Sequence, residues 1–268
     1  MRNNVNTKQI IGDTKELIIN LREDANLANK VLLTGFHGLG GIGHLTIRYI
    51  VESGLKQGKA KKMGYLIGRT MPPFVEVLQN GSFGNPYEFY EVDNAVFLLI
   101  RFQPFLEEQA VIADLLTQFA KEQGVSAIIL LGGVDINAFE DHENPPIVYI
   151  ANEEFLKNWS DKLRQLNLHP APRGIYVTGG VALFLSYATH RKIPAAALFA
   201  PTEKGIINRQ AALDLAKKIK ELLNLSVDLL EIEEELRTTE EMIRKMQEKL
   251  TKASMEAEKK EDLSQLFT

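Results

Sequence analysis

The hydrophobic positions of this chain fall into two kinds of segment that alternate along the sequence. Short runs of consecutive apolar residues, such as the Ile-Ile-Leu-Leu of residues 128–131, are typical of strands covered on both faces of a sheet. Longer segments repeat apolar residues every three or four positions, which is typical of helices with one buried face. The alternation predicts an α/β layered fold with a largely parallel or mixed central sheet flanked by helices.

Individual elements follow from these runs. The apolar runs predict strands at Leu17–Leu21, Val31–Phe36, Met63–Ile67, Ala95–Ile100, Ala127–Leu131, Ile147–Ile150, Gly174–Thr178 and Ala195–Phe199. The amphipathic segments predict helices at His44–Ser53, Glu107–Gln123, Glu153–Asn167, Ala182–His190 and Arg209–Leu223. Asn208 and Ser226 are placed to cap the helices that follow them. The Pro- and Gly-rich stretch Arg69–Phe89 predicts an irregular excursion or a hairpin.

The C-terminal part carries the longest regular pattern in the sequence. From residue 229 onward, positions at alternating spacings of three and four are apolar, apart from Thr239, and Glu, Lys and Arg fill the positions between them. This heptad pattern predicts a helix over residues 226–262, on the order of 50 Å long at 1.5 Å per residue. The pattern favours a seam with the helix of a second copy; the alternative is a helix laid back over its own subunit. The seam residues are Leu229, Ile232, Leu236, Ile243, Met246 and Leu250.

The same patterns suggest how the chain is organised. Residues 1–14 form a polar N-terminal arm, residues 15–225 an α/β core domain and residues 226–262 the heptad-patterned helix. Residues 263–268 form a flexible hydrophobic tail that ends in Leu266, Phe267 and Thr268. A free carboxylate beside large apolar residues is a group that a lysine or backbone N–H groups of a partner can capture.

Composition excludes several classes of function. The 268 residues include no cysteine, which excludes disulfides, a thiol nucleophile and cysteine-ligated metals. The net charge of −4 argues against a nucleic-acid surface, and no apolar stretch is long enough to span a membrane. The polar N-terminus lacks the apolar centre of a signal peptide, so we expect a cytoplasmic protein. The Asp141-His142-Glu143 stretch lies beside two prolines and predicts an exposed loop with no metal.

A glycine-rich turn follows the predicted strand at residues 31–36. Gly38, Gly40 and Gly43 satisfy G-x-G-x-x-G, and the N–H groups of this turn are a possible phosphate cradle in a nucleotide- or nucleoside-binding enzyme. The dinucleotide pattern calls for an acidic residue at the end of the next strand, where this chain has Gly68-Arg69. An arginine at that position could instead suit the 2′-phosphate of NADP. The alternative is that the glycines permit a tight turn and close helix–sheet packing. No nucleophile–base pair is recognisable, so we expect no catalytic residue and no cofactor.

Two further glycine pairs, Gly132-Gly133 and Gly179-Gly180, each follow a predicted strand. Ligands of open α/β sheets bind beyond the carboxyl ends of the strands. Three glycine turns at one sheet edge therefore predict either a small-molecule cleft or a flat edge for another protein.

Several of these segments together resemble the proteasome assembly chaperone family, in its archaeal homo-oligomeric branch. The similar segments are the strand and glycine turn at residues 31–43 and the later Ile-Tyr-Val-Thr-Gly-Gly of residues 175–180. The stretch Asn208–Glu235 is also similar, with an Ala-containing helix, a short turn and a Val-Asp opening to the last helix. The likeness covers nearly the whole chain.

The resemblance implies a non-enzymatic, homo-oligomeric protein that binds the α-subunits of the proteasome core particle. Archaeal members of that family and proteasome activators can end in a hydrophobic-tyrosine-any motif that docks between α-subunits. Leu266, Phe267 and Thr268 fall on those three positions. Phe267 departs from the pattern because it lacks the tyrosine hydroxyl, whose hydrogen bond is worth roughly 0.5–1.5 kcal/mol.

Overall fold

The computed structural model describes residues 7–11, 17–69, 71–78, 81–239 and 241–242. Contacts within the chain divide it into two units, residues 1–229 and residues 230–268. The first unit contains the sheet and all the helices named below. In the second unit, residues 230–239 and 241–242 are helical, so the described helix begins four residues after the predicted start at 226. None of the described helices is both long and apolar enough to cross a membrane.

Ten of the described strands form one mixed sheet, in the order β1-β2-β4-β7-β8-β3-β9-β12-β10-β11. Its centre, β8-β3-β9-β12, is parallel, whereas the flank from β1 to β7 pairs in antiparallel fashion. The predicted α/β fold class is therefore confirmed. The strands are β1 Thr7–Ile11, β2 Leu17–Arg22, β3 Val31–Gly35, β4 Ala60–Gly68, β7 Tyr87–Val92, β8 Ala95–Ile100, β9 Ala127–Asp135, β10 Val148–Ala151, β11 His169–Pro170 and β12 Ala195–Thr202.

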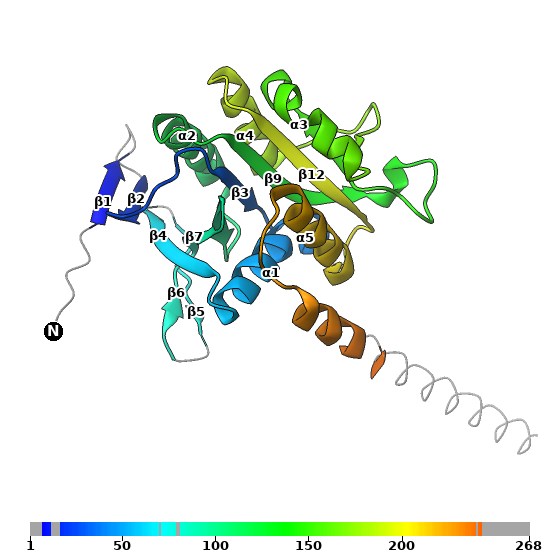
Figure 1. The fold of residues 1–268 in the computed structure, drawn as a ribbon, viewed down its shortest axis with the longest axis horizontal. Helices are drawn as coiled ribbons and strands as arrows, with labels where there is room; N and C mark the ends of the chain where they lie inside the picture. The colour runs from blue at the N-terminus through cyan, green and yellow to red at the C-terminus, as the bar shows by residue number, and fades with distance from the viewer. Residues whose placement is uncertain (1–6, 12–16, 70, 79–80, 240, 243–268) are drawn as a thin grey trace, which may run out of the picture. The chain divides into compact units, whose positions relative to one another are not determined.

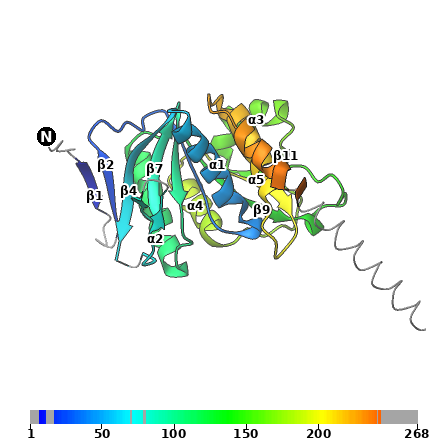
Figure 2. The same ribbon diagram turned by 90° about the horizontal axis from the view of Figure 1, so that it is seen from below.

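Helices cover both faces of this sheet (Figures 1 and 2). Helices α1 and α5 pack against each other on one face, and α2 and α4 pack against each other on the opposite face. Helix α3 lies beside α5, where Lys162 Nζ donates a hydrogen bond to the Leu222 carbonyl at 3.2 Å. The helices are α1 Ile42–Lys56, α2 Leu106–Glu122, α3 Glu153–Gln165, α4 Gly179–His190 and α5 Arg209–Leu223, with short 3₁₀ turns at Leu39–Gly41 and Ile136–Ala138.

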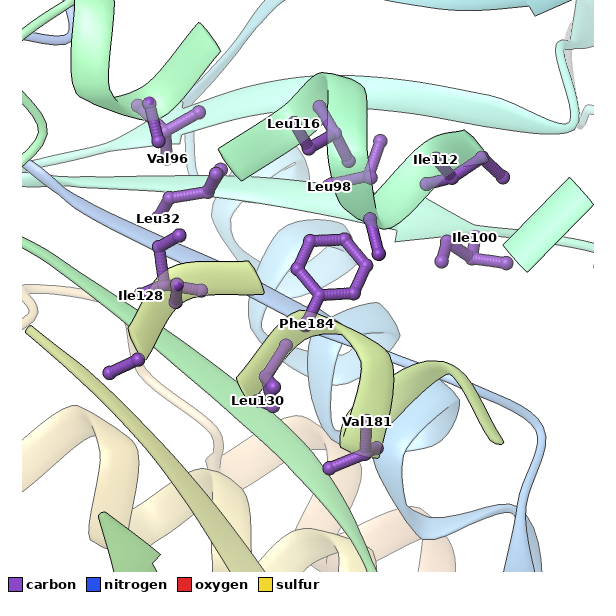
Figure 3. Close-up of a cluster of buried hydrophobic side chains, with 14 of the residues drawn as sticks. Leu32, Val96, Leu98, Ile100, Ile112, Leu116, Ile128, Leu130, Val181 and Phe184 are labelled. Atoms are coloured by element: carbon purple, nitrogen blue, oxygen red, sulfur yellow. The ribbon is translucent and has the colours of Figure 1, made fainter. Parts of the chain in front are cut away.

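The core beneath α2 and α4 shows why the central strands are apolar at nearly every position. In Figure 3, Phe184 of α4 lies among side chains from the strands and from α2, including Leu98, Leu130 and Leu116. All four side chains are at most 1% exposed. Because α1 and α5 bury the alternate residues of the same strands, the central strands have no solvent-facing side.

Several local predictions are confirmed, and others are wrong. Asn208 caps α5 by accepting a hydrogen bond from the Ala211 N–H at 2.9 Å. Ser226 caps no helix, because its N–H and hydroxyl both donate to the carboxylate of Asp93 in the β7–β8 turn. Residues 174–178, predicted as a strand, lie outside every strand of the described chain. The predicted hairpin is present as β5 (Glu76–Val77) and β6 (Phe83–Gly84), but strand β7 was not predicted.

The edge strand β11 is only two residues long. It is held against β10 by the N–H groups of His169 and Ala171, which donate to the carbonyls of Ile147 and Tyr149. Pro170 lies between these two donors and has no N–H of its own.

Candidate functional site

The glycine turn after β3 brings α1 into backbone contact with the sheet. A Cβ atom at Gly43 would lie 2.2 Å from the Leu131 carbonyl oxygen of β9, and one at Gly35 would lie 2.3 Å from the Gly43 oxygen. Gly40 has a φ of +67°, and a Cβ there would meet Thr202 of β12 at 2.9 Å. These contacts explain Gly40 and Gly43 by close helix–sheet packing, which was one of the two interpretations of the fingerprint.

The strand order places residue 69, where the dinucleotide pattern calls for an acidic residue, away from the glycine turn. Residue 69 follows β4, and the sheet places β8 and β7 between β3 and β4. In the turn itself, the N–H of Gly41 donates to the Gly38 carbonyl and that of His44 to the Phe36 carbonyl. These two amides are therefore engaged within the turn. Nucleotide binding at this loop stays a prediction. Close packing already accounts for Gly40 and Gly43, two of the three glycines in the fingerprint.

The carboxyl ends of β3, β9 and β12 surround a cavity of about 610 Å³. Strand β9 continues to Asp135 although its pairing with β3 ends at Leu131, which leaves the β3 side of its last residues without a neighbouring strand. Only part of the predicted meeting of three glycine turns is found here. Gly38 and the Gly132-Gly133 pair line the space, but that pair lies within β9 and forms no turn, and Gly179-Gly180 begin α4 and are not among the lining residues. The lining residues come from the strand ends and from the segment before α4. They are Phe36, Gly38, Leu39, Leu131, Gly132, Gly133, Val134, Asp135, Ala138, Val148, Ala171, Gly174, Ile175, Tyr176, Val177, Thr178, Val181, Phe199 and Lys204.

One ion pair belongs to this lining, and its lysine side chain is 75% exposed to solvent. Lys204 Nζ lies 2.8 Å from Asp135 Oδ2, and the hydrogen bond between them lowers the pKa of Asp135 and raises that of Lys204. Asp135 Oδ1 accepts two more hydrogen bonds, from the backbone and side-chain nitrogens of Asn137 at 3.0 and 2.9 Å. Asp135 is therefore engaged by donors from its own chain, whereas Lys204 has N–H groups to spare.

A second polar cluster, not predicted from the sequence, lies where β7 and β8 meet α1. The Glu88 carboxylate is fully buried and accepts hydrogen bonds from Arg101 at 3.0 Å and from the Tyr90 hydroxyl at 2.6 Å, and it also pairs with Lys62. Burial by itself would raise the pKa of Glu88, but the hydrogen bonds from Lys62 and Tyr90 outweigh it and hold the pKa below its usual value. The cluster therefore keeps a charged carboxylate in the core.

The cluster continues to the surface through Glu76 of the β5–β6 hairpin. Glu76 pairs with Arg101 and accepts a hydrogen bond from Arg48 of α1 at 2.7 Å. Nearby, Phe74 stacks on Phe102 with ring centroids 4.8 Å apart. These contacts fasten the hairpin to the sheet and to α1. Local sequence patterns give no signal for these contacts, because the partners are far apart in the sequence: they come from β4, β7, the end of β8, α1 and the hairpin.

Two histidines adjoin this cluster. The rings of His37 and His44 stack with centroids 3.9 Å apart, and His44 Nδ1 lies 2.7 Å from the Ile100 carbonyl oxygen. Because a carbonyl only accepts, Nδ1 of His44 carries the hydrogen. Burial, together with the charge of His37, lowers the pKa of His44 to about 4. A neutral, buried ring that anchors α1 to β8 is a structural arrangement, since no described carboxylate or hydroxyl pairs with it.

The predicted metal-free loop is also described. The Asp141 carboxylate accepts hydrogen bonds from the N–H groups of Glu143 and Asn144, and His142 Nδ1 lies 3.1 Å from the Ile136 carbonyl oxygen. These residues are thus engaged in the turns of the loop.

The predicted seam and tail are described only in part. Leu229, Ile232 and Leu236 are 3%, 8% and 7% exposed. Ile243, Met246 and Leu250 lie outside the described residues, as do Leu266, Phe267 and Thr268. The seam and the docking tail therefore stay predictions.

By its fold, the chain is a mixed α/β protein with a cavity at the carboxyl ends of its parallel strands. The family model that matches the chain, over residues 32–247, is that of the PAC2 family. The chain therefore belongs to the PAC2 family. No curated protein sequence matches it.

Solved structures share this fold. A Pyrococcus furiosus protein, PbaA, described as an archaeal homolog of proteasome-assembly chaperone, is 20% identical, with a TM-score of 0.76 over 91% of this chain and 97% of the other. PbaB of the same organism, described as an archaeal proteasome activator, is 21% identical, with a TM-score of 0.70 over 87% of this chain and 99% of the other. A PAC2 family protein from Streptomyces avermitilis is 19% identical, with a TM-score of 0.58 over 81% and 95% of the two chains. At these identities the likeness establishes the fold.

Proposed function

We propose that this protein is a non-enzymatic proteasome assembly chaperone or activator that binds α-subunits of the proteasome core particle. The observation that carries the proposal is the fold shared with PbaA over 91% of this chain. The likeness extends to PbaB, whose description names a proteasome activator. The glycine turn supports a non-enzymatic role, because packing against Leu131 and Thr202 accounts for glycines that would otherwise suggest a phosphate loop.

The proposed contact with the core particle is the C-terminal tail. Leu266, Phe267 and Thr268 provide two large apolar side chains beside a free carboxylate, a combination that backbone N–H groups or a lysine of a partner can bind. Several tails on one oligomer would raise the effective concentration and offset a weak single contact.

The test is a binding measurement with the cognate core particle immobilised and three forms of the full chain in solution. Removal of residues 266–268 is expected to abolish binding while leaving the thermal unfolding of the α/β unit unchanged. Phe267→Tyr restores the hydroxyl and is expected to tighten binding about two- to tenfold, the equivalent of one hydrogen bond. Undiminished binding by the truncated chain would refute the tail model, and no binding by the intact chain would refute the proposed partner.

Self-association through the heptad seam is the second part of the proposal. Ile243→Glu places a charge on the seam, whereas Lys245→Glu changes the charge of the same segment at a position off the seam. We expect light scattering to show a smaller particle for Ile243→Glu and an unchanged one for Lys245→Glu. Equal masses for wild type and both variants would instead favour a helix laid back over its own subunit.

A further inference from the structure

We propose that the cavity at the carboxyl ends of β3, β9 and β12 binds a small carboxylic acid with an aromatic or branched apolar body. At about 610 Å³, the cavity falls within the range of small-molecule sites, which runs from about 300 to 1,000 Å³. It lies where ligands of open α/β sheets bind. This inference does not depend on the proposed proteasome contact.

The walls define the apolar body of the ligand. Phe36 comes from the turn after β3, Phe199 from β12 and Val181 from α4, so three elements present apolar side chains to one space. Gly132 keeps that space open beside the Phe199 ring, because a Cβ atom there would lie 3.2 Å from the ring carbons. Tyr176, at 91% exposure, stands in water as part of the lining. An aromatic or branched hydrocarbon fits walls of this kind.

The polar groups define the charge of the head group. Lys204, whose side chain is 75% exposed, donates one N–H to Asp135 and retains two more, whereas both oxygens of the Asp135 carboxylate already accept hydrogen bonds from described residues. Helix α4 begins beside the cavity with no side-chain cap and no acidic residue in its first turn. Gly180 in that turn packs on the Phe36 ring, which places the positive end of the helix dipole at the same wall. Both features favour an anion over a cation.

The amount of positive charge selects a carboxylate over a phosphate ester. Among the described residues that line the cavity, Lys204 is the one with a cationic side chain, and the Asp135 carboxylate beside it offsets part of its charge. A phosphate ester carries nearly two negative charges and is typically held by several cations or by a full set of turn amides. A carboxylate carries one charge, which a lysine and a helix N-terminus can match.

The test uses the full-length protein with phenylpropionate and its neutral isostere phenylpropanamide as probes. Methyl resonances of Ile175, Val177 and Val181 are followed by NMR during each titration, and calorimetry gives the affinities. We expect saturable shifts of these methyl groups and an affinity about tenfold or more in favour of the acid, the effect of one charge-assisted hydrogen bond. Absence of saturable shifts with either probe would overturn the site, and equal affinity for the two probes would overturn the carboxylate assignment.

Three variants make the result specific to this cavity. Lys204→Met removes the charge and keeps the stem, so the acid should lose about tenfold in affinity and the amide none. Lys157→Met on α3, an exposed lysine away from the cavity, is the matched control and should change neither affinity. Val177→Trp fills the space from a half-buried position and should abolish binding of both probes, provided that its far-ultraviolet spectrum matches that of the wild type. Retained acid preference in Lys204→Met would overturn the role of that lysine.

Discussion

The buried histidine at the start of α1 makes the stability of the α/β unit depend on pH. His44 is 7% exposed, and its neutral ring donates from Nδ1 to the Ile100 carbonyl. In the unfolded chain this histidine takes up a proton near pH 6.5, whereas in the folded protein its pKa is about 4. Between these values the unfolded state binds more protons, so stability is present above pH 6.5 and is lost as the pH falls toward 4.

The magnitude follows from the linkage relation. A pKa lowered from 6.5 to about 4 reduces the free energy of unfolding by about 2 kcal/mol at about pH 5 and by about 3 kcal/mol in the limit of low pH. The charged and titratable groups that face His44 are His37, Arg48 and Glu76. Burial also lowers the pKa of His37, which adds to the loss in the same direction.

Urea unfolding followed by the fluorescence of Trp159, the only tryptophan of the chain, measures this effect. His44→Asn keeps a donor near the position of Nδ1 and cannot be protonated. We expect the wild type to lose about 2 kcal/mol more than His44→Asn between about pH 7.5 and about pH 5. His169→Asn, which replaces an exposed histidine, is the control and should follow the wild type. Equal losses in wild type and His44→Asn would refute the reasoning.

Three further outcomes are expected for the α/β unit. Gly43→Ala forces a Cβ into the Leu131 carbonyl and should lower the free energy of unfolding by about 3 kcal/mol or prevent folding, whereas Gly38→Ala, with open space at its Cβ position, should cost less than about 1 kcal/mol. Arg101→Met removes one of the two cations that pair with the buried Glu88 carboxylate and should cost about 3 kcal/mol, part of which Glu88→Gln in the same chain should restore; a loss unchanged in the double variant would contradict the charge argument. Asn208→Ala removes the α5 cap and should cost about 1 kcal/mol by thermal unfolding; no change would mean that the cap contributes nothing.

Parts of the fold with a strong local signal could be predicted from the sequence. The helix Arg209–Leu223 has a regular apolar stripe and an Asn cap, and its bounds agree with the structure. Strand Ala95–Ile100 is a continuous apolar run and also agrees. A cavity at the carboxyl ends of the parallel strands was one of the two predicted alternatives, because ligands of open α/β sheets bind beyond those ends.

Parts that depend on distant partners could not be predicted. Strand β7 has Glu88 at a buried position, and only its pairing with β4 and β8 brings Lys62 and Arg101 close enough to hold that charge. Residues 174–178 have the composition of a strand, but β12 is already paired with β9 and β10, so this segment forms a wall of the cavity. Whether a segment with strand propensity forms a strand depends on whether a neighbouring strand has an unpaired edge.

The hydrogen-bond donors of edge strand β11 limit how another strand can pair with this edge of the sheet. Its inward N–H groups, from His169 and Ala171, are spent on β10, and the residue between them that would offer a donor outward is Pro170. A strand approaching this edge would find no hydrogen-bond donor at that position, and cross-β growth from it is therefore disfavoured. Pairing of a further strand is therefore disfavoured at this edge, and an assembly that formed there would rely on contacts between side chains.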